Sequence, residues 1–296
     1  MFHRNFDLPQ PTQHHIASPY PYRNSAGSDA SVVIAASVAA LRAKVAELGA
    51  DNVAAFFCEP IQGSGGVVVP PVGWLKAMRE AARDLDILFV ADEVITGFGR
   101  TGPMFACEAE SVSPDLMTVA KGLTAGYAPM GAVILSDMVY AGIADGAAPE
   151  AVVGHGQTYS GHPVSAAVGL EVIRLYTEGG ILANGQRVGR HFEAGLAALS
   201  NHPLVGEARA RGMLGALELV ADKSSKTPFD PALGLSERLF RRGYDNGIVF
   251  RAFADGTIGL APALSCTDAE MALLLTRLRR TLDSVLEDPD VRAALR

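Results

Sequence analysis

An α/β fold is predicted by the pattern of short apolar segments along the first half of the chain. Segments of strand length alternate with segments that carry apolar residues at helical spacing. The expected strands are residues 53–58, 87–91, 116–120 and 132–135. Because these strands are apolar throughout instead of alternating, they are typical of a sheet covered by helices on both faces.

The remaining elements follow in order and suggest two domains. Helices are expected at 32–48, 72–85, 163–176, 183–199 and 268–286, and further strands at 215–220 and 249–250. The second half mixes helices and strands without the alternation of the first half. We therefore predict a large domain at residues 1–178 and a small α+β domain at residues 179–296.

Composition excludes several classes of protein. The net charge is −7 and no basic stripe occurs, which argues against a nucleic-acid partner. The three cysteines are too scattered for a disulfide framework or a thiolate metal site, so no metal is expected. No apolar run has the length of a membrane span, and the N-terminal residues lack an apolar leader. A cytoplasmic location is expected.

Polar residues close three successive predicted strands. Glu59, Asp92 and Lys121 stand at these ends, and ligands of such sheets bind outside the carboxyl ends of the strands. A carboxylate that ends a buried strand needs a cationic or protonated partner, although a helix cap or salt bridge would also satisfy Asp92. The apolar flanks of Lys121 favour a desolvated amine that can attack aldehydes over the alternative of an ordinary surface lysine. Together the pair suggests pyridoxal phosphate (PLP) chemistry.

Residues 97–102, GFGRTG, match the dinucleotide-binding pattern G-x-G-x-x-G. That pattern requires a helix to open at the glycines and an acidic residue about 20 positions later. Here Pro103 follows the third glycine, residues 104–113 show no helical period, and Asp92 and Glu93 precede the glycines. We therefore predict a tight loop after a strand.

Four stretches of the chain resemble the class III PLP-dependent aminotransferases, in particular the ω-amine:pyruvate transaminases. They are residues 59–63 (EPIQG), 91–102 (ADEVITGFGRTG), 114–123 (PDL with AKGL) and 158–163 (TYSGHP). They occur in the order in which the family has them. The resemblance implies a fold-type-I PLP-dependent transferase, with a three-layer α/β large domain and a small α+β C-terminal domain.

The resemblance also implies roles for single residues. Lys121 matches the lysine that holds PLP as a Schiff base and then shuttles a proton, and Asp92 matches the aspartate that pairs with the pyridine nitrogen. Val94 matches the apolar residue packed on one ring face. Thr158 matches the threonine that reaches the phosphate of the neighbouring subunit in family dimers. Glu59 stands where the family has a Glu-Pro motif in its active site.

Two further positions bear on the substrate. Arg251 looks like the arginine that binds a substrate carboxylate, and its guanidinium suits that task, although an exposed salt-bridging arginine is the alternative. Ile95 stands where ornithine- and aminobutyrate-type members carry Gln, which favours the amine:pyruvate branch.

The resemblance covers only the C-terminal two-thirds of a typical member. The family's Ser/Gly-rich phosphate loop and its stacking aromatic would precede residues 20–23, and this chain contains neither. The large domain is thus expected to be incomplete at its N-terminus, with an exposed sheet edge and exposed apolar surface.

The expected function is amino transfer from a primary amine or ω-amino acid to a keto acid such as pyruvate, by a homodimer that uses PLP. Two alternatives stay open. The chain could be a catalytically silent remnant, or a piece of a split enzyme, that acts only in assembly. It could also keep PLP but act as an aminomutase or decarboxylase, as relatives of this family do.

Overall fold

The computed structural model describes residues 9–145 and 154–296. The chain forms two compact units, each described here by itself. The first comprises the residues up to Phe56 together with Pro70–Phe89, and the second comprises Phe57–Val69 together with Val90–Arg296. This division differs from the one expected at residue 178, and that boundary stays a prediction.

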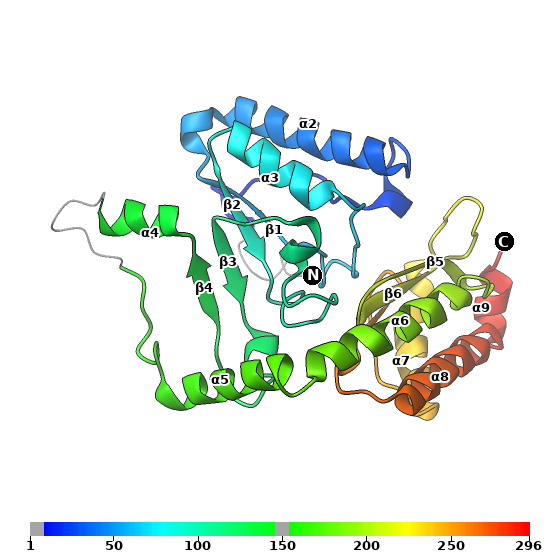
Figure 1. Ribbon diagram of the computed structural model, residues 1–296. Helices are drawn as coiled ribbons and strands as arrows, with labels where there is room; N and C mark the ends of the chain where they lie inside the picture. Colours follow the sequence, from blue (N-terminus) through cyan, green and yellow to red (C-terminus); the bar gives the residue numbers. More distant parts are fainter. Residues whose placement is uncertain (1–8, 146–153) are drawn as a thin grey trace. The chain divides into compact units, whose positions relative to one another are not determined.

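Two helices of the first unit lie side by side (Figure 1). They are α2 (Ala30–Leu48) and α3 (Trp74–Asp84). The side chain of Asp29 accepts a hydrogen bond from a backbone N–H of the first turn of α2, which fixes where that helix begins. The Arg42 guanidinium lies 2.7 Å from the Asp84 carboxylate and links the two helices.

The first sheet has the strand order β1-β2-β3-β4. Its strands are β1 (Ala55–Cys58), β2 (Leu88–Asp92), β3 (Leu116–Val119) and β4 (Ala132–Leu135). Strands β2 and β3 are parallel, with Asp92 opposite Thr118, so both have their carboxyl ends at the same edge of the sheet. Strand β4 is antiparallel to β3.

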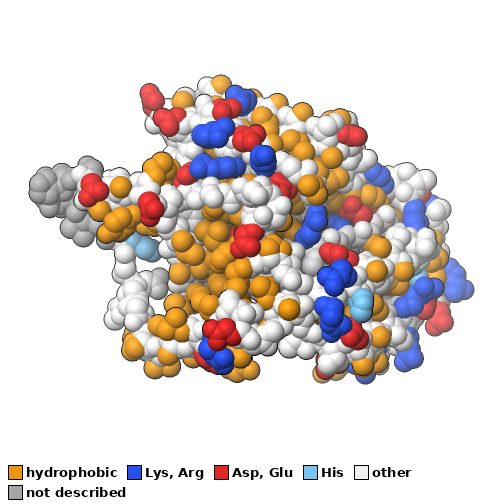
Figure 2. Space-filling view, viewed as in Figure 1, with side chains coloured by type: hydrophobic (Ala, Val, Ile, Leu, Met, Phe, Trp, Pro, Cys, Tyr) orange, Lys and Arg blue, Asp and Glu red, His pale blue; other side chains and the backbone are white. Residues whose placement is uncertain are grey.

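Strand β4 is not covered on both faces, contrary to the expectation for this sheet. All four of its residues are exposed, including Ile134 with 48% of its surface accessible. The strand is last in the order and, among the described residues, pairs with β3 alone, so one of its edges is unpaired. Figure 2 shows hydrophobic side chains gathered over β4 and α5 (Pro163–Thr177). An exposed edge with apolar surface was expected from the sequence.

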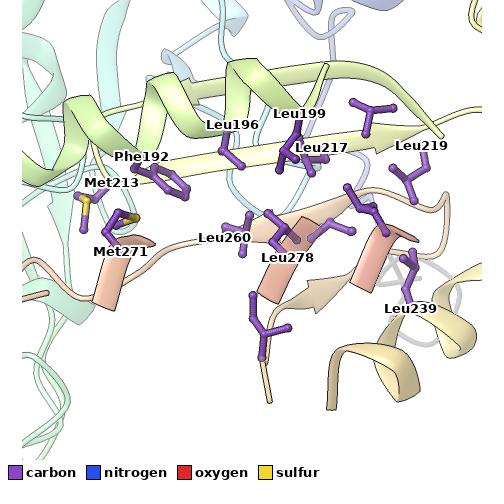
Figure 3. Packing of buried hydrophobic residues seen from close by; sticks show 14 of the residues in the cluster. Phe192, Leu196, Leu199, Met213, Leu217, Leu219, Leu239, Leu260, Met271 and Leu278 are labelled. Atoms are coloured by element: carbon purple, nitrogen blue, oxygen red, sulfur yellow. The ribbon is translucent and has the colours of Figure 1, made fainter. Parts of the chain in front are cut away.

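The second sheet is antiparallel and has the strand order β5-β6-β8-β7. Its strands are β5 (Val205–Arg211), β6 (Leu214–Leu219), β7 (Arg251–Ala252) and β8 (Ile258–Leu260). The sheet packs with α6 (Ile181–Leu199) and α8 (Asp268–Leu286), and Figure 3 shows Phe192 and Leu196 of α6 beside Leu217 of β6. This core leaves β6 buried along its whole length.

Three shorter helices complete the second unit: α4 (Asp137–Ala144), α7 (Leu235–Asp245) and α9 (Pro289–Ala294). Strand β7 begins at Arg251, two residues later than the strand expected at 249–250. In residues 9–145 and 154–296, no helix has both the length and the apolar character needed to cross a bilayer. The same ranges contain no group of three or more His, Cys, Asp or Glu side chains that could hold a metal ion.

Candidate active site

The ends of the first three strands bring Glu59, Asp92 and Lys121 close enough for their charges to interact. Burial raises the pKa of Glu59, and the hydrogen bond from the Gly63 N–H lowers it. The Asp92 carboxylate adds to the rise and the Lys121 ammonium opposes it. The Gly63 nitrogen donates to Glu59 Oε2 over 2.9 Å. Parallel pairing of β2 and β3 therefore assembles a polar cluster from residues distant in the sequence.

Asp92 is half-buried, and one of its two carboxylate oxygens is fixed by hydrogen bonds. Oδ1 accepts from the Val94 N–H and from Thr118 Oγ1, each over 3.0 Å. Thr118 can donate because the strand register places it directly opposite Asp92. Within the part of the chain that the structure describes, Oδ2 accepts no hydrogen bond. Asp92 thus presents a held carboxylate with one open acceptor, which suits a positively charged N–H group.

Lys121 begins a short 3₁₀ turn, Lys121–Leu123, just after β3. Its φ of 39° lies in the left-handed region, which is costly for a residue other than glycine and is common at functional sites. The Tyr176 hydroxyl donates to the Gly122 carbonyl over 2.9 Å and holds the turn. A Cβ at Gly122 would lie 2.8 Å from Phe98 Cβ, so only glycine fits there.

The expectation of a desolvated Lys121 is wrong for this structure, because the side chain is exposed. The apolar residues that precede Lys121 belong to strand β3. Lys121 itself lies beyond the end of that strand, in the 3₁₀ turn. Its amine therefore faces open space at the rim of the sheet.

That space is a cavity of about 840 Å³, and both Lys121 and Arg251 line it. Most of the wall is apolar. It includes Ile95, Phe98, Tyr176, Leu214, Phe253 and Leu264. An amine, a guanidinium and an apolar wall in one cavity are suited to a small organic substrate with an anionic group.

Arg251 lies on β7 with an exposed side chain, and its guanidinium carbon lies 5.0 Å from the centre of the Phe253 ring. In the described ranges no carboxylate comes within ion-pair distance of this guanidinium. Within these ranges, Arg251 therefore has no carboxylate partner for the alternative role of a salt-bridging surface arginine. Stacking on an aromatic ring leaves the edge of the guanidinium free to bind a carboxylate.

Four of the expected site residues do not line the cavity: Glu59, Asp92, Val94 and Thr158. Val94 contributes its N–H to Asp92, and Glu59 accepts from the Gly63 N–H. Thr158 is exposed in a turn where the Ser160 N–H donates to the Gln157 carbonyl over 2.9 Å. The roles assigned to these residues, and to Lys121 and Arg251, stay predictions.

Glu93 is a buried residue whose importance sequence reasoning missed. Its carboxylate accepts hydrogen bonds from Thr96 Oγ1, from the Ala106 N–H over 3.0 Å and from the Cys107 N–H over 2.8 Å. This side chain ties the loop after β2 to the 3₁₀ helix Ala106–Glu110. Its signal in the sequence is an acidic residue between a strand end and a glycine turn.

The GFGRTG segment is a loop, as predicted. Phe98, Gly99 and Gly102 have φ values of 58°, 82° and 113°, and no helix opens at these residues. Arg100, in the same loop, lines the cavity and donates to the carbonyls of Met213 and Pro262. Burial lowers the pKa of Arg100. The loop thus forms part of the cavity wall and is joined to the β5–β6 hairpin.

Comparisons with known proteins agree on one family. The model of the aminotransferase class-III family matches residues 1–282. An uncharacterized aminotransferase of Sinorhizobium fredii is 38% identical over 290 residues, covering 97% of this chain and 62% of that protein. The putrescine–pyruvate aminotransferase of Pseudomonas aeruginosa is 42% identical over 285 residues, covering 95% of this chain and 60% of that enzyme.

Solved structures lead to the same family. A thermostable (S)-enantioselective ω-transaminase from Thermomicrobium roseum superposes with a TM-score of 0.88 at 38% identity, over 93% of this chain and 60% of that one. A transaminase obtained by ancestral reconstruction gives a TM-score of 0.93 at 37% identity, over 97% of this chain and 64% of that one. These matches confirm the resemblance and the fold class expected from the four stretches. The chain spans about three-fifths of the length of the curated relatives, 62% and 60% for the two named here.

Proposed function

Because this chain belongs to the aminotransferase class-III family, we propose that it serves amino transfer from a primary amine or ω-amino acid to a keto acid such as pyruvate. The observation that carries the proposal is the shared cavity of Lys121 and Arg251, with Glu59 and Asp92 at the adjacent strand ends. An amine that reacts with aldehydes and a guanidinium that binds carboxylates are the two groups that such a reaction needs.

PLP, the cofactor implied by the family, fits the residues present. The open Oδ2 of Asp92 can accept from the protonated ring nitrogen, and Lys121 Nζ can hold the aldehyde carbon. When bound, PLP would supply an electron-withdrawing ring that stabilises negative charge on the substrate carbon that loses its proton. We assign Val94 to one face of the ring and Thr158 to the phosphate of a second subunit.

The residues of this chain have separable tasks. Once its amine is free, Lys121 Nζ would take up the proton released from the substrate carbon and give it back. The two hydrogen bonds at Oδ1 keep the Asp92 carboxylate in the orientation in which Oδ2 can accept. Arg251 donates to the carboxylate of the keto acid while the Phe253 ring supports its guanidinium. The apolar wall offers a contact surface for the carbon skeleton of the substrate.

The proposed substrates follow from the wall and from the relatives. Ile95 gives the cavity an apolar surface that suits an amine without a second charge. One relative is named for putrescine and pyruvate, and one solved relative for ω-transamination. A homodimer is part of the proposal because Thr158 is exposed outside the cavity, where it would serve another subunit.

The test is PLP binding by the purified protein. We expect an absorbance band that sodium borohydride removes and that Lys121→Ala abolishes, together with a loss of transfer of about 10²–10⁴-fold or more. Lys226→Ala is the matched control, because Lys226 also has a left-handed backbone, with φ 57°, and does not line the cavity. It should keep both the band and the activity.

Each remaining alternative predicts a different result. If PLP gives no band with the wild-type protein, amino transfer by this chain is rejected in favour of the remnant or assembly role. If the band forms but the product is an isomerised or decarboxylated amine with no amino group on the keto acid, the chain has aminomutase or decarboxylase chemistry.

A further inference from the structure

One wall of the cavity is a tight turn at residues 62–68, called here the 62–68 turn. Gln62 and Val68 pair as an antiparallel bridge, and the Val67 N–H donates to the Gly63 carbonyl over 3.0 Å. Gly63, Ser64 and Val67 line the cavity. Val67 has φ 55°, a left-handed value that is costly for a β-branched residue. The turn therefore needs contacts from outside to keep this conformation.

Arg209 of β5 supplies those contacts. Its Nε donates to the Val67 carbonyl over 2.9 Å, and one terminal nitrogen donates to the Gly66 carbonyl over 2.6 Å. The other terminal nitrogen lies 2.6 Å from Glu207 and 3.1 Å from Glu218. The Arg209 and Glu218 side chains each have only 7% of their surface exposed. The guanidinium thus joins two carboxylates of the second sheet to two carbonyls of the turn.

The other end of the turn leads directly to the polar cluster. The Gly63 N–H donates to Glu59, whose carboxylate interacts with Asp92 and Lys121. Gly63 also packs closely on Ile95, because a Cβ at Gly63 would lie 2.2 Å from Ile95 Cδ1. A shift of the turn would therefore move both the Glu59 hydrogen bond and the apolar wall.

We propose that Arg209 is a positioning residue for the cavity, holding the 62–68 turn so that Gly63, Ser64 and Val67 form its wall. This inference rests on the proposed function in taking the cavity as the substrate site. Arginine suits the task because its planar fork can donate to four acceptors at once, whereas a lysine amine cannot span them. Buried ion pairs are weak evidence for stability, and here the pair instead specifies a conformation.

The experiment compares Arg209→Met with Arg238→Met. Arg238 makes a similar set of contacts, to the Leu233 carbonyl, Asp288 and Asp290, and does not line the cavity. Hydrogen exchange by mass spectrometry on a peptide covering residues 60–70 reports on the turn without any turnover. We expect Arg209→Met to exchange there at least about tenfold faster, the scale of lost hydrogen bonds to a charged group.

In the amine:keto-acid assay we expect Arg209→Met to raise KM for the amine about tenfold while kcat changes less. Arg238→Met should lower the melting temperature but leave both the exchange of residues 60–70 and KM unchanged. Arg209→Lys keeps the charge. Compared with Arg209→Met, it should restore the melting temperature more than it restores the protection of residues 60–70 from exchange. If Arg209→Met does not fold, the exchange of residues 60–70 and KM are measured on Arg209→Lys instead.

Exchange and KM at wild-type values in the folded Arg209 variants would overturn the proposal, as would equal effects from Arg238→Met. If the wild-type protein has no transaminase activity, the proposed function fails, whereas exchange of residues 60–70 still decides whether Arg209 holds the turn.

Discussion

Strands β6 and β4 are both rich in apolar residues, yet all six residues of β6 are buried and all four residues of β4 are exposed. Strand β6 lies between β5 and β8 and packs with α6 and α8, so its cover comes from segments before and after it in the chain. Strand β4 pairs, in the part of the chain that the structure describes, with β3 alone. Apolar composition therefore predicts the strand, whereas burial depends on neighbours that are distant in sequence.

The largest effect on stability should come from truncating a side chain of the buried strand. Leu217 of β6 is fully buried and Ile134 of β4 is 48% exposed. We expect Leu217→Ala to lower the free energy of unfolding by about 2–5 kcal/mol, because it leaves a cavity. Ile134→Ala should cost less than about 1 kcal/mol. Urea denaturation measures both, and equal losses would mean that β4 is covered in solution.

A smaller, pH-dependent effect is expected at His202, which precedes β5. The side chain is 1% exposed, and burial lowers its pKa from 6.5 although Asp283, 3.3 Å away, opposes the change. Since the unfolded chain takes up the proton first, stability should fall as pH drops through 6.5 towards the lower folded pKa.

His202→Asn should remove this decline between about pH 7.5 and 5.5. Asparagine can still accept the Leu204 N–H that Nδ1 of His202 accepts over 3.2 Å. His191→Asn, a substitution of an exposed histidine, is the control and should keep the decline. A wild-type protein whose unfolding free energy does not change over this range would contradict the prediction.

The smallest effect on stability, within about 0.5 kcal/mol, is expected for Ile134→Glu on β4. A charge on an apolar edge strand should instead weaken self-association, because such edges pair with other chains. Sedimentation velocity at several concentrations measures this. Leu273→Glu, at an exposed position of α8, is the control for an added charge alone. Equal association of the two variants would show that β4 is not a contact surface.

Much of the fold could be predicted from the sequence because the signal was local. Helix α8 begins and ends at the expected residues, and a capping box between Thr267 and Glu270 explains its start. Strand β5 and helix α7 were not predicted. Strand β5, VGEARAR, carries charged residues at alternate positions. One of them, Arg209, is buried only because Glu207 and Glu218 and the 62–68 turn surround it.

For the site, strand ends could be predicted and long-range contacts could not. Asp92 and Lys121 stood out because each closes an apolar strand. The exposure of Lys121 was missed because apolar neighbours in sequence belong to the strand and not to the turn. The link between Arg209 and Val67 joins residues 142 positions apart, and no pattern in one sequence connects them.

The left-handed backbone of Lys121 sets stability against reactivity at a single position. A lysine at φ 39° costs about 1–2 kcal/mol relative to glycine, which adopts such angles freely. Gly122 and the Tyr176 hydroxyl, not the lysine side chain, define the turn. Selection for stability alone would therefore favour glycine at residue 121 and keep the surrounding shape intact. A protein that has lysine there retains a residue that weakens its fold, and the amino transfer proposed above would give that residue a use.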